Sequence, residues 1–199
     1  MFFGIHLLLF VQMGGICNHN DNELLALMKQ GDRGAMKVFY DRYVGYMSAI
    51  AGRYIASATD RKDVLQESFI KIFSSVGRFE PLREGSLRVW IARITVNESL
   101  RFLKKNSVLD FIDNDALLPD VADEPDVDVV SDDLLNDMLL SMPTGYRMVF
   151  NLYVFEQKSH KEIAEMLGIS ESTSASQFSR AKSLLAKKIK EYKLAHENE

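Results

Sequence analysis

The sequence predicts an all-helical (all-α) fold of two small domains, and three observations lead to this prediction. Apolar residues recur at spacings of three and four, and no run alternates convincingly between apolar and polar residues. The length of 199 residues is enough for one domain or two small ones. An acidic stretch with prolines lies between two helical parts of the sequence, and its composition is typical of a linker without regular structure. We therefore expect domains over residues 20–106 and 131–195, joined by a linker over 107–130.

The acidic linker changes how the net charge of −4 is interpreted. Ten acids and no lysine or arginine lie between residues 107 and 133. The chain has 28 acids and 24 lysines and arginines, so the remainder has 18 acids against 24 cations, a balance of +6. The acidity is therefore concentrated in one segment, and both flanks are mildly basic.

No residue pattern supports an enzyme or a metal protein. The single cysteine, Cys17, excludes an internal disulfide and a cysteine zinc site. The four histidines are scattered, and the sequence has neither a phosphate-binding glycine loop nor a nucleophile elbow. We expect no catalytic residue, no metal, no cofactor and no small-molecule substrate.

Residues 1–19 form an apolar N-terminal extension. The run over residues 1–11 is too short to span a bilayer comfortably and lacks the positive leading residues of a signal peptide. We interpret it as an upstream extension of the reading frame, with Met13 as the working start, and we expect a cytoplasmic protein. A membrane-tethered interaction protein is the competing interpretation of this run.

The first domain is predicted to contain four helices. They are expected to begin near Asn20, Asp32, Thr59 or Asp60, and Ser86, and to end near Gln30, Ala56, Val76 and Lys105. The third helix has an apolar stripe, and opposite it lie Asp63, Glu67, Ile70 and Ser74, flanked by Gln66 and Lys71. This face is either a solvated surface or a protein-docking surface with Ile70 at its centre.

The fourth helix combines a narrow basic stripe with sides that are nearly all apolar. The stripe consists of Arg93, Asn97, Arg101 and Lys104. It can follow a nucleic-acid backbone, with Asn97 able to read a base, or it can be a solvated surface. Trp90 can stack on an unpaired base, although packing in the core is the more common role of a tryptophan.

The second domain is predicted to begin at Ser131 and to include a helix over residues 144–155, with Pro143 in its first turn. Ser159 and Glu162 resemble a capping box that starts the next, short helix. Gly168 suits a left-handed helix end, and Ser170 can cap the helix that follows. This tight spacing favours a helix-turn-helix over an ordinary helical hairpin.

The last helix has two unlike faces. Its apolar side consists of Phe178, Ala181, Leu185 and Ile189. The opposite side carries Ser172, Ser176, Ser179, Arg180, Ser183 and Lys187. Small hydroxyls at the start of a helix, followed by cations, suit entry into the major groove, where the helix start approaches base edges and the cations meet phosphates.

Taken together, these motifs resemble those of the extracytoplasmic-function (ECF) type sigma factors, a compact two-domain class of bacterial transcription initiation factor. Residues 60–73, DRKDVLQESFIKIF, are similar to the family's D-x-x-D-[LV]-x-Q-E-x-F-x-K block. Residues 85–97 resemble its glycine–tryptophan–asparagine segment, and residues 140–143, 162–164 and 168–170 resemble its second domain. The resemblance covers nearly everything from Asn22 to Tyr192.

The resemblance implies a role for each candidate residue. The residues expected to face the clamp helices of the largest RNA polymerase subunit are Asp63, Gln66 and Glu67, with Ile70 beside them. Those expected to open the duplex and capture a base of the minus-ten element are Trp90, Arg93, Asn97, Arg101 and Lys104. Those expected at the minus-thirty-five element are Ser172, Thr173, Ser176, Gln177 and Arg180, with Lys182 and Lys187 on phosphates.

The implied partners are core RNA polymerase and promoter DNA, and an anti-sigma factor is common in the family. The acidic linker is expected to occupy polymerase channels that later carry RNA. The competing function is a stand-alone helix-turn-helix transcriptional regulator, with the first domain used for dimerisation or sensing. The two functions differ in whether DNA binding depends on polymerase.

Overall fold

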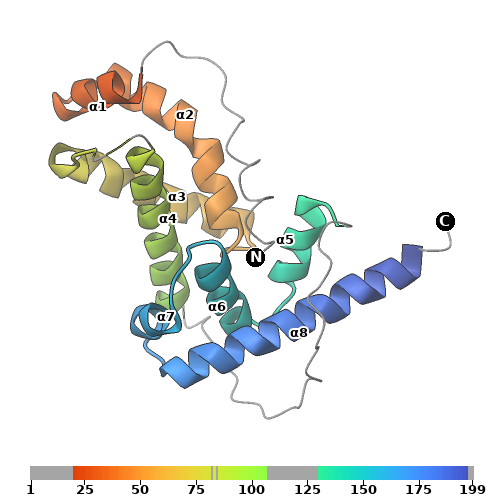
Figure 1. The fold of residues 1–199 in the computed structure, drawn as a ribbon. Helices are drawn as coiled ribbons and strands as arrows, with labels where there is room; N and C mark the ends of the chain where they lie inside the picture. The colour runs from red at the N-terminus through yellow and green to blue at the C-terminus, as the bar shows by residue number, and fades with distance from the viewer. Residues whose placement is uncertain (1–19, 82, 84, 107–129, 197–199) are drawn as a thin grey trace. The chain divides into compact units, whose positions relative to one another are not determined.

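The protein is helical throughout the part that the structure describes. The computed structural model describes residues 20–81, 83, 85–106 and 130–196, and within them it has eight α-helices, α1 to α8, and one 3-10 turn (Figure 1). The predicted all-helical fold is therefore confirmed. The predictions for residues 1–19 and for most of the acidic linker, 107–129, lie outside the described residues. Among the described helices, none is long and apolar enough to cross a membrane.

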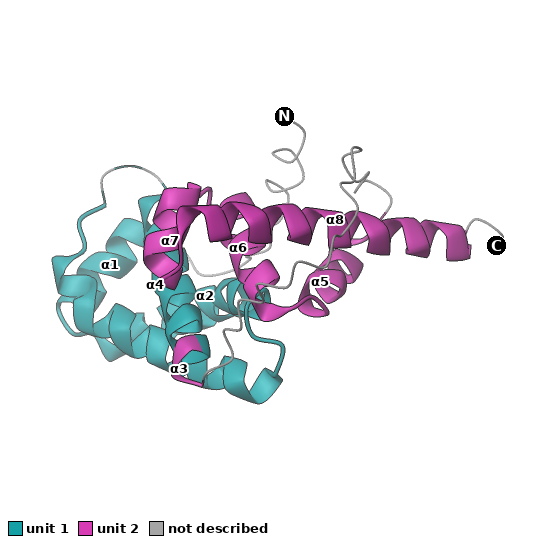
Figure 2. Cartoon of the chain, turned by 90° about the horizontal axis from the view of Figure 1, so that it is seen from below, with its two compact units in different colours: residues 1–103 teal, residues 104–199 magenta. Residues whose placement is uncertain are grey.

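The chain divides into two compact units, residues 1–103 and 104–199 (Figure 2). The first unit contains α1 (Asp21–Lys29), α2 (Arg33–Gly52), α3 (Ala58–Ser75), the 3-10 turn η2 (Val76–Arg78) and most of α4 (Ser86–Lys105). The second contains α5 (Asp132–Leu140), α6 (Thr144–Val154), α7 (His160–Leu167) and α8 (Glu171–His196).

One apolar core holds the helices of the first unit together. Its fully buried centre includes Leu24 of α1, Phe39 of α2, Ile72 of α3 and Ile91 of α4. The Phe39 and Phe69 rings meet edge to face with their centroids 6.4 Å apart, which is a favoured aromatic geometry. Each helix therefore turns its apolar stripe inward, and the polar positions opposite each stripe are left at the surface.

Side-chain caps decide where the helices of this unit begin. The Asp32 carboxylate accepts a hydrogen bond of 2.8 Å from the Ala35 amide, as predicted for the start of α2. The prediction that Thr59 or Asp60 caps α3 is wrong, because the Ser57 hydroxyl accepts from the Asp60 amide instead. The second helix also stops at Gly52, earlier than the predicted end near residue 56.

The second unit has its own core, centred on Leu139, Ala181 and Leu185 from α5 and α8, with Phe150 of α6. Ser131, where the second domain was predicted to begin, caps α5 by accepting a hydrogen bond from the Leu134 amide. Pro143 occupies the position just before the first turn of α6, one residue earlier than expected. Since proline has no backbone N–H to leave unpaired, it starts a helix at little cost.

Candidate functional site

The polar face predicted on α3 is exposed. Asp63, Gln66 and Glu67 all lie at the surface, and Ile70 is 52% exposed, which is unusual for a large aliphatic side chain. This exposure follows from the packing of the opposite side, where Val64, Phe69 and Ile72 are buried. The expectation that these four residues lie on one accessible face is therefore met.

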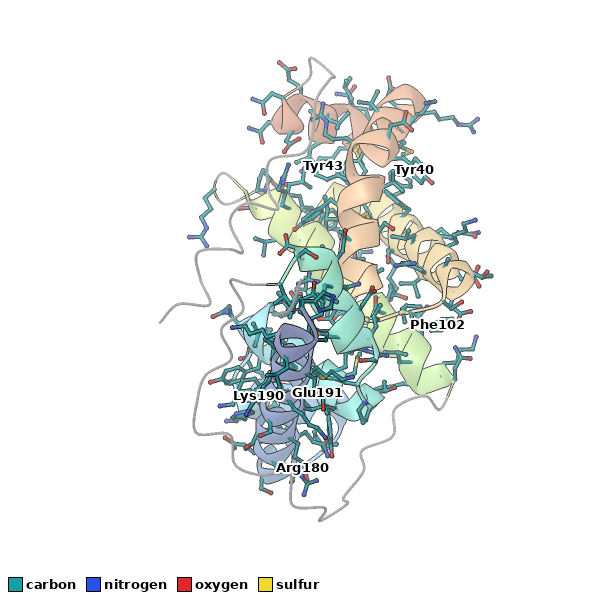
Figure 3. All side chains as sticks on the ribbon, turned by 90° about the vertical axis from the view of Figure 1, so that its right-hand side faces the viewer. Tyr40, Tyr43, Phe102, Arg180, Lys190 and Glu191 are labelled. Atoms are coloured by element: carbon teal, nitrogen blue, oxygen red, sulfur yellow. The ribbon has the colours of Figure 1, made fainter. Side chains whose placement is uncertain are left out.

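A tyrosine of α2 that the sequence did not single out is exposed and contacts α3. Tyr40 is 45% exposed, and its ring centroid lies 4.6 Å from that of Phe69 (Figure 3). Tyr40 and Ile70 are two of only five large hydrophobic residues that are exposed in the described part of the chain. We name Asp63, Gln66, Glu67 and Ile70 the docking face.

The basic stripe of α4 is also at the surface. Arg93, Asn97 and Lys104 are exposed, and the side chain of Arg101 is 59% exposed. Successive members are separated by three or four residues, so they lie along one side of the helix. We name these four residues the α4 basic face. Val89, which was predicted to lie on an apolar side of this helix, is exposed as well. The helix is therefore less buried than the sequence predicted.

Trp90 packs inside the first unit on at least one side of its ring. The indole is partly buried and lies against the core, and it stacks on Phe79 with ring centroids 4.4 Å apart and an angle of 21° between the planes. The ring face that contacts Phe79 is not accessible to a base. This geometry favours the core-packing interpretation of Trp90 over base stacking.

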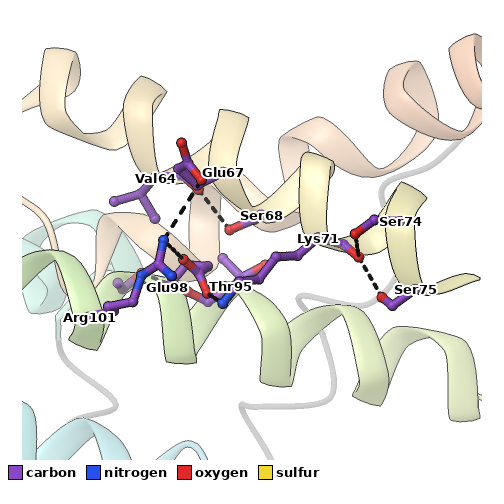
Figure 4. A network of polar contacts seen from close by, with 10 residues as sticks. Val64, Glu67, Ser68, Lys71, Ser74, Ser75, Thr95, Glu98 and Arg101 are labelled. Carbon is purple, nitrogen blue, oxygen red and sulfur yellow. Dashed lines mark hydrogen bonds and ion pairs between the residues drawn. The ribbon is translucent and has the colours of Figure 1, made fainter.

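A buried carboxylate on α4 was missed by the sequence analysis. The side chain of Glu98 is only 2% exposed, and it is paired with Lys71 of α3 and with Arg101, whose Nη2 lies 3.0 Å from Glu98 Oε2. The same Arg101 nitrogen lies 3.7 Å from Oε2 of Glu67, a member of the docking face. Figure 4 shows that this network bridges α3 and α4.

The turn between α7 and α8 has the local geometry that the sequence predicted. Ser159 and Glu162 form a complete capping box at the start of α7. Gly168 ends the helix in the left-handed region at φ 75°, where a side chain would strain the backbone. The Ser170 hydroxyl accepts a hydrogen bond of 2.9 Å from the Thr173 amide and so caps α8. The helix-turn-helix connection is thus defined by its caps.

Aromatic stacking fixes α7 against α6 and α8. The His160 ring stacks on Tyr153 of α6 with centroids 4.8 Å apart, and its Nδ1 lies 3.0 Å from the Ser174 hydroxyl of α8. Tyr153 in turn packs against Phe178 of α8 at 4.2 Å. In the sequence, His160 is one of four scattered histidines, and its role was not predictable because its partners come from two other helices.

The polar side of α8 is exposed only in part. Ser172 and Lys187 are exposed, while Thr173, Ser176 and Arg180 are partly buried (Figure 3 labels Arg180). Lys182 is also exposed, and its ammonium lies 5.2 Å from the centre of the Phe178 ring, which restrains the side chain. These six residues remain candidates for contact with DNA.

Two predictions on α8 are wrong. Gln177 is fully buried, so its side chain is not placed to read a base, and Ser183 is buried as well. The cause is that α8 packs against three other helices of its unit, α5, α6 and α7, so its buried side is wider than one apolar stripe. Ser174, one turn before Gln177, is buried for the same reason and contacts His160.

Comparisons with known proteins agree with this arrangement. A family model described as Sigma-70 region 2 matches residues 39–108, and one described as Sigma-70, region 4 matches residues 132–185. The ECF RNA polymerase sigma-E factor of Haemophilus influenzae is 29% identical over 182 residues, which cover 85% of this chain and 95% of the relative. The ECF RNA polymerase sigma factor SigW of Bacillus subtilis is 26% identical over 177 residues, covering 82% and 94%.

A solved structure titled "Structure of CnrH in complex with the cytosolic domain of CnrY" covers 84% of this chain and 95% of its own, with 21% identity and a TM-score of 0.46. The two sigma-70 regions occur here in one chain and in the same order as the two helical units. Together with the curated relatives, they show that the chain belongs to the sigma-70 family as an ECF-type RNA polymerase sigma factor, a factor that initiates transcription.

Proposed function

We propose that the two units divide the work of promoter recognition and opening between them. The first unit, as the core of a domain over residues 20–106, docks on core RNA polymerase through α3 and acts on the minus-ten element through α4. The second, in a domain over residues 131–195, recognises the minus-thirty-five element through α7 and α8. The observation that carries the proposal is the presence of an exposed acidic and apolar face on α3 beside an exposed basic face on α4.

The docking face has the composition of a protein interface. Ile70 supplies exposed apolar surface, and Asp63 and Glu67 supply negative charge beside it, while the exposed Tyr40 lies on α2. Apolar and aromatic residues at the centre of an interface contribute most of the affinity, whereas charges at the rim steer association. A positively charged, partly apolar surface of the polymerase is the partner that this face fits.

The α4 basic face supports contact with the promoter near the minus-ten element. Arg93, Arg101 and Lys104 can neutralise phosphates, and the exposed amide of Asn97 can form two hydrogen bonds with an adenine edge. Extruding a base costs a few kcal/mol, which contacts in the pocket and polymerase binding must offset. Because Phe79 occupies one face of Trp90, we assign Trp90 to supporting this surface and not to stacking on the base.

In the second unit, the start of α8 supports contact with base edges. Ser172, Thr173 and Ser176 place hydroxyls in the first turns of the helix, and Arg180 follows one turn later. Lys182 and Lys187 are assigned to phosphates. Gln177 is left out of this set, because its side chain is buried.

Run-off transcription tests the proposal directly. The full chain is combined with core RNA polymerase on genomic fragments, and discrete transcripts that require the chain are expected. Footprinting of an active fragment then compares the chain alone with the chain plus core polymerase. Protection only in the presence of polymerase supports the proposal, whereas equal protection by the chain alone would favour a stand-alone regulator. The occurrence of both sigma-70 regions in one chain argues against that regulator.

Two further proposals rest on family membership. The chain is expected to work in the cytoplasm, where core RNA polymerase and promoter DNA are found. An anti-sigma factor is expected as a partner that keeps the chain from core polymerase. Purification of the tagged chain from cells in which its transcripts are silent should then recover a stoichiometric protein partner in place of polymerase subunits.

A further inference from the structure

Glu98 stands out because a carboxylate is buried where the helix pattern calls for an apolar side chain. Ile91, Thr95 and Glu98 follow one another at spacings of four and three, and all three are buried. A buried carboxylate is unfavourable unless it is paired, and an apolar residue of similar size is often equally good or better for stability. Stability alone therefore does not explain this glutamate.

The two oxygens of Glu98 are paired with different cations. Oε1 contacts the Lys71 ammonium from α3, and Oε2 lies 3.0 Å from Arg101 Nη2 on the next turn of α4 (Figure 4). The contact with Lys71 ties two helices together, so it is a structural contact. The contact between Glu98 and Arg101 stays within α4, and the same Arg101 nitrogen lies farther, 3.7 Å, from Glu67 Oε2 of α3.

Arg101 combines an anchored guanidinium with an exposed side chain. The Glu98 carboxylate fixes one nitrogen of the guanidinium, yet 59% of the side chain remains accessible to solvent. Arginine has five N–H donors, so the pair with Glu98 leaves donors for a phosphate. An arginine that is already held in place loses less side-chain entropy when it binds.

We propose that Glu98 is a positioning residue for DNA binding, because it holds the guanidinium of Arg101 on the α4 basic face. Glu98 itself is buried and does not contact DNA. This inference rests on the proposed function of α4 as a DNA-binding helix, and it adds a residue that acts through Arg101. Arg93 lies two turns earlier on the same face and is not anchored by Glu98, so it is the matched comparison.

The test is a double-mutant cycle on the full chain assembled with core RNA polymerase. The Kd for a fluorescein-labelled DNA with a duplex part and a single-stranded part is measured at low salt by fluorescence anisotropy. Phosphate contacts do not depend on sequence, so the promoter need not be known. The variants are E98Q, R101Q, R93Q and the doubles E98Q/R101Q and E98Q/R93Q, each checked for a native circular dichroism spectrum.

E98Q is expected to weaken DNA binding about two- to fivefold, the range for a charge pair at the edge of a protein surface. The loss should disappear in the R101Q background, because no guanidinium remains to be positioned, and it should persist in the R93Q background. A loss of the same size in all three backgrounds would overturn the proposal, since Glu98 would then act through the fold as a whole. Unchanged binding by E98Q in the native background would also overturn it.

A second pair of variants keeps the proposal falsifiable if E98Q does not fold. R101K and R93K both retain the positive charge but lose the planar fork of the guanidinium. R101K is expected to weaken binding more than R93K, because only residue 101 is held by Glu98. Equal losses would contradict the proposal.

The same data separate this inference from the proposed function. If R93Q weakens DNA binding and the cycle between Glu98 and Arg101 shows no coupling, only the positioning role is wrong. If neither R93Q nor R101Q changes binding or its salt dependence, α4 is not a DNA-binding surface, and both proposals are wrong.

Discussion

In the first unit, the candidate faces of α3 and α4 are joined by a buried ion-pair network between the two helices, whereas in the second unit the turn between α7 and α8 is held by caps at helix ends. Glu98 and Lys71 join α4 to α3, and Arg101 of the α4 basic face lies between Glu98 and Glu67 of the docking face. In the second unit, Ser159 caps α7 and Ser170 caps α8.

This difference predicts how far a single substitution would disturb the structure of each unit. A change in the Glu98 network affects two helices at once, because one buried carboxylate serves cations from both. A change at a cap affects only the first turn of one helix, and it costs about 1 kcal/mol. The docking face and the α4 basic face are therefore expected to be coupled, while the caps of α7 and α8 act separately.

The largest expected effect comes from reversing the charge of the docking face. Replacing Asp63 and Glu67 with Arg (D63R/E67R) should lower transcription about a hundredfold or more, because like charges brought together at an interface cost several kcal/mol. Run-off transcription and pull-down of core polymerase measure the loss. Both side chains are exposed, so the fold should survive.

Glu191→Arg is the control for this reversal. Glu191 is exposed on α8 beyond residue 185, where the match to region 4 ends. Its reversal should leave core polymerase binding nearly unchanged. Full transcription by D63R/E67R would show that α3 does not dock on polymerase. The comparison between the two units would then no longer include a docking face in the first unit.

The next effect is on stability, and it tests the claim that the first unit depends on a central contact. E98Q should lower the free energy of unfolding by about 1–3 kcal/mol, because a buried charge pair loses one partner. The loss is smaller than for a fully buried pair, since Lys71 and Arg101 are both partly exposed. Urea denaturation followed by circular dichroism measures it.

Glu67→Gln provides the comparison for E98Q, since Glu67 is exposed and only 3.7 Å from the same arginine nitrogen. E67Q should change the free energy of unfolding by no more than about 0.5 kcal/mol. If E98Q and E67Q lower the free energy of unfolding by the same amount, the burial of Glu98 does not strengthen its ion pairs. The network then contributes no more than a cluster of charges at the surface.

A smaller effect is expected from Arg180 in the second unit. Replacing Arg180 with Ala should weaken binding to upstream promoter DNA about tenfold and reduce the slope of log K against log salt by about 1, as for the loss of one phosphate contact. The holoenzyme is titrated with promoter DNA at several salt concentrations. An unchanged slope would mean that Arg180 does not contact phosphate.

Much of the second unit could be predicted from the sequence because its determinants are local. A capping box needs a serine and a glutamate three residues apart, and both Ser159 and Glu162 lie within one turn. Gly168 and Ser170 mark the next helix end and start in the same direct way. The periodic exposed faces of α3 and α4 were predictable for the related reason that helix periodicity is also a local pattern.

The Glu98 network could not be predicted in this way, because Lys71 and Glu98 come from different helices and no local spacing connects them. The only signal was an acid in line with Ile91 on an apolar stripe. Gln177 was misassigned for a similar reason, since several helices pack on α8 and bury residues beyond its apolar stripe. Ser57 was missed because serine, threonine and aspartate can all cap a helix, and residues 57, 59 and 60 offer all three within four positions.

The smallest expected effect is the contribution of the α7 cap to stability, which should depend on pH through Glu162. Lys158 donates a hydrogen bond to Glu162, and the amide and hydroxyl of Ser159 donate to the same carboxylate. These contacts lower the pKa of Glu162 from 4.5 to about 2. Because the folded state lowers this pKa, the stabilisation is complete above about pH 4.5 and is lost as the pH falls toward 2.

The melting temperature of E162Q should therefore be below that of the native chain at neutral pH, and the gap should narrow as the pH falls below about 4.5. Glu165→Gln on the same helix is the control, because Glu165 is exposed and takes no part in the capping box. At neutral pH, the melting temperature of E165Q should differ less from that of the native chain than the melting temperature of E162Q does. A gap for E162Q that stayed constant over this range of pH would mean that the carboxylate charge does not support the cap, and the second unit would then depend on its aromatic stack around His160 instead.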